Sequence, residues 1–234
     1  MRVIAGSAKG RRLKGPDTLE TRPILDRVKT ALFDILAPDI AGTRFLDLFA
    51  GAGSVGIEAL SRGADAATFI ELSPEIVKLV RENLTLTGLT ATAEVIRADA
   101  FAFMRMARAQ RRVWDIIYVA PPQYKGMAAQ ALERLDREPL TAPGALVIVQ
   151  IHPRERGDLD ALSLTRLRLY DNRTYGSTLL LFYEHAEETE ERAPGQSDPA
   201  SATSATSATS ATSATSATSA TTSTSQEAPH EPAQ

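Results

Sequence analysis

The sequence predicts an α/β fold with a mostly parallel sheet and an antiparallel hairpin at one end of the sheet. Two observations carry this prediction. Between residues 44 and 181 short apolar runs alternate with helical patterns, and the last two apolar runs are separated only by "DNRTYGS". Strands that alternate with helices form a parallel sheet covered on both faces, whereas strands joined by a short turn pair antiparallel. The expected strands lie near residues 44–49, 67–71, 93–97, 114–119, 145–151, 165–171 and 177–183, and the expected helices near 54–62, 74–87, 100–109 and 126–138.

A further helix is predicted before the sheet, in "TRPILDRVKTALFDIL". Proline is well suited to the first position of a helix, so Pro23 marks its start. The helical period places four apolar residues on one stripe, namely Leu25, Val28, Leu32 and Leu36. We expect this stripe to pack on the domain while three basic side chains point outward, namely Arg22, Arg27 and Lys29.

The composition predicts one globular domain followed by a disordered tail. The chain has 234 residues and 43% hydrophobic content, which is enough to bury a core. From Ser201 the sequence repeats Ser-Ala-Thr and lacks the large apolar groups that offset ordering entropy. We therefore expect a folded domain over residues 1–184, in which 1–36 form a basic segment and helix, and a low-complexity tail over 185–234.

Several kinds of site and location are disfavoured by what the sequence lacks. It has no cysteine, and its three histidines, His152, His185 and His230, are too scattered for a metal cluster, so we expect no metal. No apolar run approaches the roughly 20 residues of a membrane helix, and the first residues show no signal-peptide pattern. We expect a cytoplasmic protein that does not contact a membrane.

The first 29 residues carry a local charge of +5, from eight basic and three acidic side chains. A segment of this kind either binds a polyanion such as a nucleic acid or is a solvated, mobile arm. The charge alone leaves both possibilities open.

A glycine-rich stretch, "FLDLFAGAGSVGIEAL", runs from a predicted strand through Gly51, Gly53 and Gly56 into a helix. Glycine lets the backbone turn tightly and approach a ligand, and the helix N-terminus favours negative charge. The G-x-G-x-x-G spacing also occurs in nicotinamide-binding enzymes, so a dehydrogenase is one alternative. Asp47 favours another ligand, because a carboxylate just before the loop repels a pyrophosphate but attracts the ammonium group of S-adenosylmethionine.

Two more acids follow the next predicted strands. Glu71 ends the second strand and is placed to bind both ribose hydroxyls, and Asp99 after the third strand is placed to accept a hydrogen bond from the adenine amino group. The carboxyl ends of the strands are where open parallel sheets bind ligands. Asp99 taken alone fits a helix N-cap equally well.

The fourth predicted strand runs into "VAPPQY" at residues 119–124. Proline donates no hydrogen bond and pushes the preceding residue toward an extended backbone, so we expect the carbonyls of Ala120 and Pro121 to point outward. Beside a methyl donor these acceptors would hold the exocyclic amine of a nucleobase while Tyr124 stacks on its ring. A plain turn between strand and helix is the alternative.

Four stretches, joined to this proline-rich segment, resemble the bacterial 16S rRNA guanine-N2 methyltransferase family: "MRVIAGSAKGRRL", "RPILDRVKTALF", "LDLFAGAGSVGIEALSRGA" and "TYGSTLLLFYE". The resemblance covers roughly residues 1–184. It implies a Rossmann-like, seven-stranded, S-adenosylmethionine-dependent methyltransferase fold. It also implies methylation of one guanine in 16S rRNA, within an assembling small ribosomal subunit, and a role in ribosome maturation. We expect a monomer.

The resemblance also implies roles for individual residues. The implied cofactor-binding residues are Asp47, Phe49, Gly51, Gly53, Glu71, Leu72, Asp99 and Ala100. The implied catalytic, target-base segment consists of Ala120, Pro121, Pro122, Gln123 and Tyr124. The implied RNA-binding residues are Arg2, Lys9, Arg11, Arg12, Arg22 and Arg27.

The target-base segment departs from the family pattern, which is Asp-Pro-Pro followed at once by Phe or Tyr. Here Ala120 replaces the acid and Gln123 is inserted before Tyr124. We expect the Gln123 oxygen and main-chain carbonyls to serve as neutral acceptors in place of the stronger, charge-assisted bond of an aspartate. The alternatives are a catalytically silent RNA-binding assembly factor and a methyltransferase that acts on another nucleic acid.

Overall fold

The structure is a computed structural model that describes residues 1–16 and 24–185. Arg22, Pro23 and nearly all of the predicted tail lie outside the described residues, and the expected domain boundary after residue 184 stays a prediction. The described residues all fall within one compact unit. None of the helices in this described part is long and apolar enough to span a membrane.

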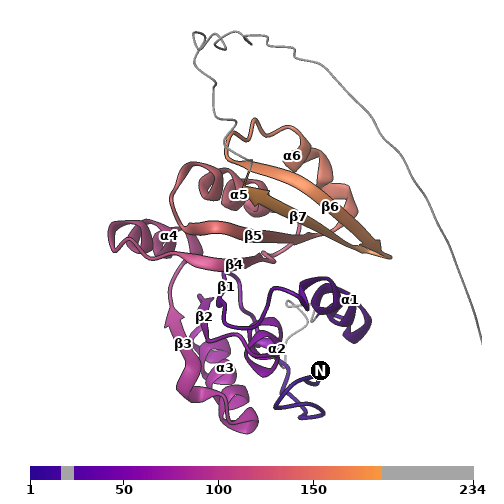
Figure 1. The fold of residues 1–234 in the computed structure, drawn as a ribbon, viewed down its shortest axis with the longest axis vertical. Helices are drawn as coiled ribbons and strands as arrows, with labels where there is room; N and C mark the ends of the chain where they lie inside the picture. Colours follow the sequence, from indigo (N-terminus) through magenta and orange to yellow (C-terminus); the bar gives the residue numbers. More distant parts are fainter. Residues whose placement is uncertain (17–23, 186–234) are drawn as a thin grey trace, which may run out of the picture. The chain divides into compact units, whose positions relative to one another are not determined.

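Seven strands form one sheet in the order β3-β2-β1-β4-β5-β7-β6. The first five strands in this order, β3, β2, β1, β4 and β5, run parallel to one another. Figure 1 shows β1 beside β4. Their bounds are β1 (Arg44–Asp47), β2 (Ala66–Glu71), β3 (Ala93–Arg97), β4 (Trp114–Val119), β5 (Thr141–Ile151), β6 (Leu167–Tyr175) and β7 (Thr178–His185). The predicted fold class is confirmed.

The last two strands form the predicted antiparallel hairpin, but its turn is shorter than predicted. Most of "DNRTYGS" belongs to β6, and only Gly176 and Ser177 separate the two strands. Tyr175 pairs with Thr178 across the turn, where Gly176 has φ +62°. The hairpin does not simply extend the sheet, because β7 lies between β5 and β6 and pairs antiparallel with both. β7 is buried from Leu179 to Tyr183, whereas most of β6 is exposed or half-buried at the sheet edge.

The four helices predicted between strands are present, and their ends differ from the predicted ends by at most one residue. Local capping explains some of these starts: the Ser73 side chain accepts a hydrogen bond from the Ile76 amide, and Pro74 occupies the first turn of its helix. The helices are α1 (Asp26–Leu36), α2 (Ser54–Ser61), α3 (Pro74–Thr87), α4 (Ala100–Ala109), α5 (Met127–Arg137) and α6 (Arg156–Asp160). Two 3-10 turns, η1 (Thr90–Thr92) and η2 (Pro153–Glu155), and the short α6 are not among the predicted elements.

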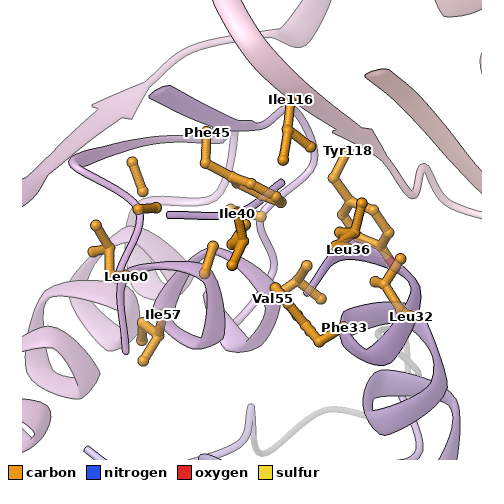
Figure 2. Close-up of a cluster of buried hydrophobic side chains, with 14 of the residues drawn as sticks. Leu32, Phe33, Leu36, Ile40, Phe45, Val55, Ile57, Leu60, Ile116 and Tyr118 are labelled. Carbon is orange, nitrogen blue, oxygen red and sulfur yellow. The ribbon is translucent and has the colours of Figure 1, made fainter. Parts of the chain in front are cut away.

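Both faces of the sheet are covered, because side chains alternate along each strand. In β4, Ile116 and Tyr118 belong to an apolar layer with α1 and α2, whereas Ile117 and Val119 belong to a second layer with α4 and α5. Figure 2 shows the first layer, in which Ile116 and Tyr118 point toward the apolar side chains of the two helices. The ends of the strands are therefore held by packing from both sides.

Helix α1 differs from its prediction at two residues. Leu25, predicted in the buried stripe, precedes the helix in an extended conformation and is 53% exposed. Val28, Leu32 and Leu36 are buried as predicted. Lys29, predicted to point outward, is fully buried. The extended backbone at the start of the helix takes Leu25 off the helical stripe. Lys29 is buried because it pairs with the buried carboxylate of Glu58.

The N-terminal segment, residues 1–16, packs against α2. Arg2 and Arg12 form an antiparallel bridge, so the segment folds back on itself. At its closest approach Gly6 has φ +81°, and a Cβ there would lie 1.7 Å from the carbonyl oxygen of Ser61. The Ser7 amide donates to the same oxygen at 2.8 Å. For residues 1–16 the structure thus favours an ordered basic surface over a mobile arm.

Candidate active site

The predicted site segments meet at one edge of the sheet, where the parallel strands have their carboxyl ends. Asp47, the last residue of β1, is in register with Phe69 of β2 and Tyr118 of β4. In the loop after β1, the Ala50 amide donates to the carbonyl of Ile70 in β2 at 2.9 Å. The loops after β1, β2 and β4 therefore begin side by side, at the edge where open parallel sheets bind ligands.

The glycines of the loop after β1 meet different physical needs. Gly51 and Gly53 have φ of +51° and +78°, a backbone region that favours glycine. Gly56 lies inside α2, where a Cβ would come within 2.4 Å of Phe69 Cε1. Close packing on β2 thus fixes the N-terminus of α2 at the sheet edge, where its amides favour a negatively charged ligand group.

Asp47 is buried, and one of its oxygens lacks a partner. Oδ2 accepts a hydrogen bond from the Gly56 amide at 3.1 Å, whereas Oδ1 has no partner among residues 1–16 and 24–185. Burial raises the pKa of Asp47 to about 7, the Gly56 bond opposes this shift, and the charge of Glu71 adds to it. Because a buried polar atom without a partner is costly, Oδ1 is suited to a donor from a cationic ligand.

Glu71 joins the glycine loop to the loop after β2. Its Oε2 accepts from the Gly51 amide at 3.1 Å, and its Oε1 accepts from the amides of Leu72 and Ser73 at 2.8 and 2.9 Å. A carboxylate has about four acceptor positions, so a position on Oε2 remains for a ligand hydroxyl.

The other predicted cofactor residues differ in exposure. Asp99 caps α4, its side chain accepting a main-chain amide hydrogen bond of 2.9 Å, so the N-cap expectation holds. Leu72 is 63% exposed, and Phe49 is partly buried with its ring centre 6.3 Å from that of Phe101. Ala100 is buried. Leu72 therefore offers apolar surface beside Glu71, whereas Ala100 belongs to the core.

The segment after β4 leaves its polar and aromatic groups exposed. Pro121 is buried, Pro122 and Gln123 are exposed, and Tyr124 is 61% exposed. Within the described part of the chain the carbonyls of Ala120 and Pro121 accept no hydrogen bond. Tyr124 has φ +61°, a left-handed backbone that costs a non-glycine residue about 1–2 kcal/mol. A strained, exposed aromatic beside available acceptors fits a binding role better than a plain turn.

Two residues without a predicted role belong to this site. Glu155 Oε1 accepts from the Tyr124 amide at 2.8 Å, and the rings of His152 and Tyr124 lie 5.5 Å apart between centroids at an angle of 46°. In the sequence, His152 counts only as evidence against a metal cluster, and no local pattern singles out Glu155. Strand order would have found them, because β4 and β5 are parallel neighbours and the residues after both strands meet at one edge.

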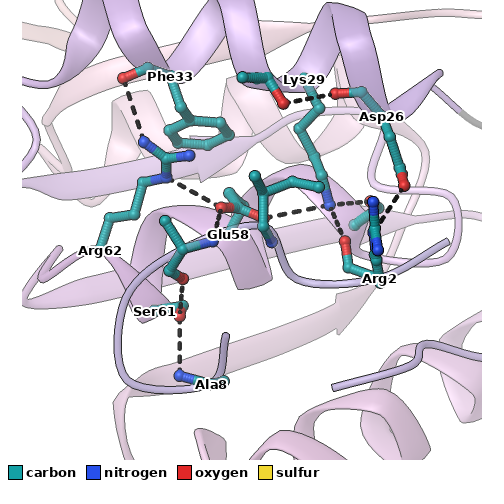
Figure 3. Close-up of polar contacts among 12 residues, drawn as sticks. Arg2, Ala8, Asp26, Lys29, Phe33, Glu58, Ser61 and Arg62 are labelled. Atoms are coloured by element: carbon teal, nitrogen blue, oxygen red, sulfur yellow. Dashed lines mark hydrogen bonds and ion pairs between the residues drawn. The ribbon is translucent and has the colours of Figure 1, made fainter. Parts of the chain in front are cut away.

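A buried ion pair joins α1 to α2, and both of its side chains also bind main-chain groups of the N-terminal segment. Lys29 Nζ lies 3.2 Å from Glu58 Oε2, and both side chains are fully buried. Figure 3 shows Lys29 also reaching the N-terminal segment, where Nζ donates to the Arg2 carbonyl at 2.7 Å, and Nζ donates to the Ser54 hydroxyl at 3.1 Å. The Glu58 carboxylate accepts from two amides of that segment at 2.8 and 3.0 Å and pairs with Arg62. Burial lowers the pKa of Lys29, and the charge of Glu58 opposes this. Lys29 is a structural connector and does not point toward solvent.

The predicted RNA-binding residues that the structure describes are exposed. Lys9, Arg11 and Arg12 have no acidic partner within residues 1–16 and 24–185. Arg2 pairs with an aspartate of α1 at 3.1 Å, and Arg27 is exposed on the same helix. The N-terminal segment and the start of α1 therefore present an exposed basic surface.

Strand order, glycine loop and acids at successive strand ends define the class of Rossmann-like, S-adenosylmethionine-dependent methyltransferases. The fold agrees with a solved RNA methyltransferase from Salinibacter ruber in complex with S-adenosyl-L-homocysteine. The two structures superpose with a TM-score of 0.56 and 17% sequence identity. The match covers 73% of the present chain and 97% of the Salinibacter ruber protein.

The chain belongs to the family described as Conserved hypothetical protein 95, which matches residues 1–184. Ribosomal RNA small subunit methyltransferase D from Haemophilus influenzae is 38% identical over 151 residues, covering 64% of this chain and 78% of that protein. A solved hypothetical protein from Thermus thermophilus is 34% identical with a TM-score of 0.63, covering 78% of this chain and 98% of that one. The resemblance drawn from the sequence is confirmed.

Proposed function

We propose that this protein transfers a methyl group from S-adenosylmethionine to the exocyclic N2 of a guanine in 16S rRNA. The observation that carries the proposal is the acidic edge next to the 120–124 segment, since Asp47 and Tyr118 are in register on neighbouring strands. The relative named as a small-subunit rRNA methyltransferase supports rRNA as the substrate. We further propose that a monomer acts in the cytoplasm on an assembling small subunit.

The cofactor supplies a methyl group on a sulfonium and leaves as a neutral thioether. Three acids of this chain are suited to hold it. The buried Oδ1 of Asp47 accepts from its ammonium, Oε2 of Glu71 from a ribose hydroxyl, and the carboxylate of Asp99 from the adenine amine. Gly51 and Gly53 allow the main chain to approach it closely.

Placement of the target amine is the main task of the protein in this reaction. The carbonyls of Ala120 and Pro121 and the amide oxygen of Gln123 supply the acceptors for the two amine hydrogens and keep the nitrogen lone pair directed at the methyl group. As the nitrogen takes the methyl group from sulfur, it loses one of its two hydrogens as a proton to solvent. Tyr124, exposed at 61%, stacks on the base. Stacking is worth about 1–3 kcal/mol and helps to offset the few kcal/mol needed to take a base out of its stack.

Gln123→Ala is expected to lower the rate constant for methyl transfer about 2- to 10-fold, because a neutral hydrogen bond contributes about 0.5–1.5 kcal/mol. Single-turnover transfer of labelled methyl measures the change, and cofactor affinity is expected to stay the same. Gln130→Ala makes the same replacement at an exposed position of α5 and serves as the matched control. An unchanged rate in Gln123→Ala would remove glutamine from the proposed acceptor set.

The exposed basic surface predicts RNA binding that weakens as salt rises. Replacing both Arg11 and Arg12 by alanine is expected to reduce the slope of log affinity against log salt by about 0.7 per lost phosphate contact. Filter binding of 16S rRNA fragments across a salt series measures this slope. The control replaces Arg105 and Arg108, exposed on α4 against the opposite face of the sheet. Equal slopes in wild type and the Arg11/Arg12 variant would show that this surface is not the anchor.

Transfer of labelled methyl to 16S rRNA in unmethylated small subunits tests the proposed function, with the product identified after digestion to nucleosides. We expect N2-methylguanosine. Ala120 in place of the family's acid supports one second candidate, a catalytically silent RNA-binding assembly factor. Cofactor and subunit binding without any transfer would favour that candidate. Transfer only to another nucleic acid would keep the chemistry and replace the substrate.

A further inference from the structure

Glu155 is a buried carboxylate that connects the loop after β4 to the turn after β5. It is 7% exposed, and each of its oxygens accepts a different main-chain amide. Oε1 accepts from Tyr124 at 2.8 Å and Oε2 accepts from His152 at 3.1 Å. The positions of both aromatic residues therefore depend on one side chain.

The Tyr124 backbone needs such a support. Its φ of +61° lies in the left-handed region, which is unfavourable for a residue with a Cβ. A hydrogen bond from an amide to a carboxylate is stronger than one to a neutral acceptor, so the bond to Glu155 opposes that cost. Glu155 thus keeps the Tyr124 ring exposed in a conformation that the free chain disfavours.

The His152 ring is oriented by its own hydrogen bond. Its Nδ1 accepts from the Arg154 amide at 3.2 Å, so the neutral ring carries its proton on Nε2. Nε2 makes no hydrogen bond within residues 1–16 and 24–185. The His152 ring is half-buried beside the exposed Tyr124 ring, 5.5 Å away at 46°. Together the two rings offer a stacking surface with a hydrogen-bond donor at its side.

We propose that His152 contacts the target base, its Nε2–H donating to the O6 carbonyl of the guanine that stacks on Tyr124, and that Glu155 is the positioning residue for both rings. This inference rests on the proposed function. An N–H at this place donates a hydrogen bond to the carbonyl of guanine and disfavours a purine that carries an amine at the same position. The contact would supply base selection that the neutral Ala120 segment does not.

The test compares guanine with 2,6-diaminopurine at the methylated position of a 16S rRNA fragment. Diaminopurine keeps the reactive N2 amine but carries an amine in place of O6 and an unprotonated N1 in place of N1–H, so the O6 contact is read from the change that His152→Phe makes in the preference. Wild type is expected to prefer guanine about 10-fold in kcat/KM, within the range of one specific base contact. His152→Phe keeps a ring beside Tyr124 and loses the donor. We expect its kcat/KM to fall about 10-fold for guanine and by less than about twofold for diaminopurine.

Glu155→Gln and Glu155→Ala test the positioning role. Glutamine retains one acceptor, so its guanine kcat is expected to lie between those of wild type and Glu155→Ala, with cofactor affinity unchanged. Imidazole NMR is expected to show the His152 Nε2–H tautomer in wild type and a shifted signal in Glu155→Gln. Glu133→Gln, at an exposed surface ion pair, is the matched control. If the Glu155 variants unfold, His152→Phe still tests the contact with the base, because it leaves both main-chain hydrogen bonds to Glu155 in place.

The outcomes separate the two claims. Methylation of guanine with the same guanine preference in wild type and His152→Phe would overturn this inference and leave the proposed function standing. Transfer to no guanine by wild type would overturn both. Loss of the preference in His152→Phe, with unfolding midpoint and cofactor affinity unchanged, would establish the contact.

Discussion

Glu58→Ala is expected to lower the free energy of unfolding by about 3–5 kcal/mol, the usual cost of removing one partner of a buried ion pair. The variant leaves Lys29 as a buried cation, with its Nζ formerly 3.2 Å from the lost carboxylate. It also removes the acceptor of the Ile4 and Ala5 amides. Urea unfolding at pH 7 measures the change, and Trp114, the one tryptophan in the chain, provides a fluorescence signal from the core.

Glu133→Ala removes a glutamate from a surface pair and serves as the control. Glu133 and Arg137 are 2.8 Å apart, with side chains 42% and 70% exposed. We expect a change of less than about 0.5 kcal/mol, because solvent screens such a pair. A Glu58→Ala variant as stable as this control would contradict the burial of Lys29 and the anchoring of the N-terminal segment to α2.

Asp47→Asn is expected to weaken cofactor binding by about 30-fold or more, because truncating a buried, hydrogen-bonded charge pair costs about 2–5 kcal/mol. Asparagine has the same shape and keeps an acceptor for the Gly56 amide, which lies 3.1 Å from Asp47 Oδ2. The loss therefore reports the charge. Isothermal titration with S-adenosyl-L-homocysteine, which retains the ammonium, measures the affinity of both proteins. Asp99→Asn makes the same change at the exposed cap of α4 and is expected to have a smaller effect.

The same titration has a predicted pH dependence. The pKa of Asp47 is raised to about 7 by burial, so the carboxyl is largely protonated at pH 5.5 and largely ionised at pH 7.5. An ammonium ligand binds the ionised form, which means that binding releases a proton and strengthens as pH rises. We expect a gain of about 20-fold over this range in wild type and little change in Asp47→Asn. Parallel pH profiles would assign the dependence to another group.

Much of the fold follows from local pattern. Short apolar runs predict the buried strands β1–β5, and apolar residues at the helical period predict the helices α2–α5 between them. Residues such as Ser73 with Pro74, and Asp99, mark helix starts for reasons contained within one turn. The acids at the ends of β1 and β2 are predictable for the same reason, since a residue at a strand end needs no distant partner to be placed there.

The errors arise where placement depends on residues far apart in the sequence. The hydrophobic pattern of α1 predicts that a lysine lies on the solvent side of the helix. Lys29 is buried instead, because Glu58 and the Arg2 carbonyl satisfy its ammonium group. The partnership of Tyr124 with His152 and Glu155 requires knowing that β4 and β5 are adjacent. The place of β7 between β5 and β6 is also a matter of pairing, and both strands of a hairpin show similar local patterns.

The position of β7 also sets the order in which the protein matures during its own synthesis. Chains emerge from the ribosome from the N-terminus at about 5–20 residues per second, so β1–β5 are available before the strand that pairs with both β5 and β6. Until Thr178–His185 have emerged, β5 carries an unpaired apolar edge and β6 has no partner. A nascent chain stopped at Tyr175 therefore cannot complete the sheet, and it is a natural target for chaperones and proteases.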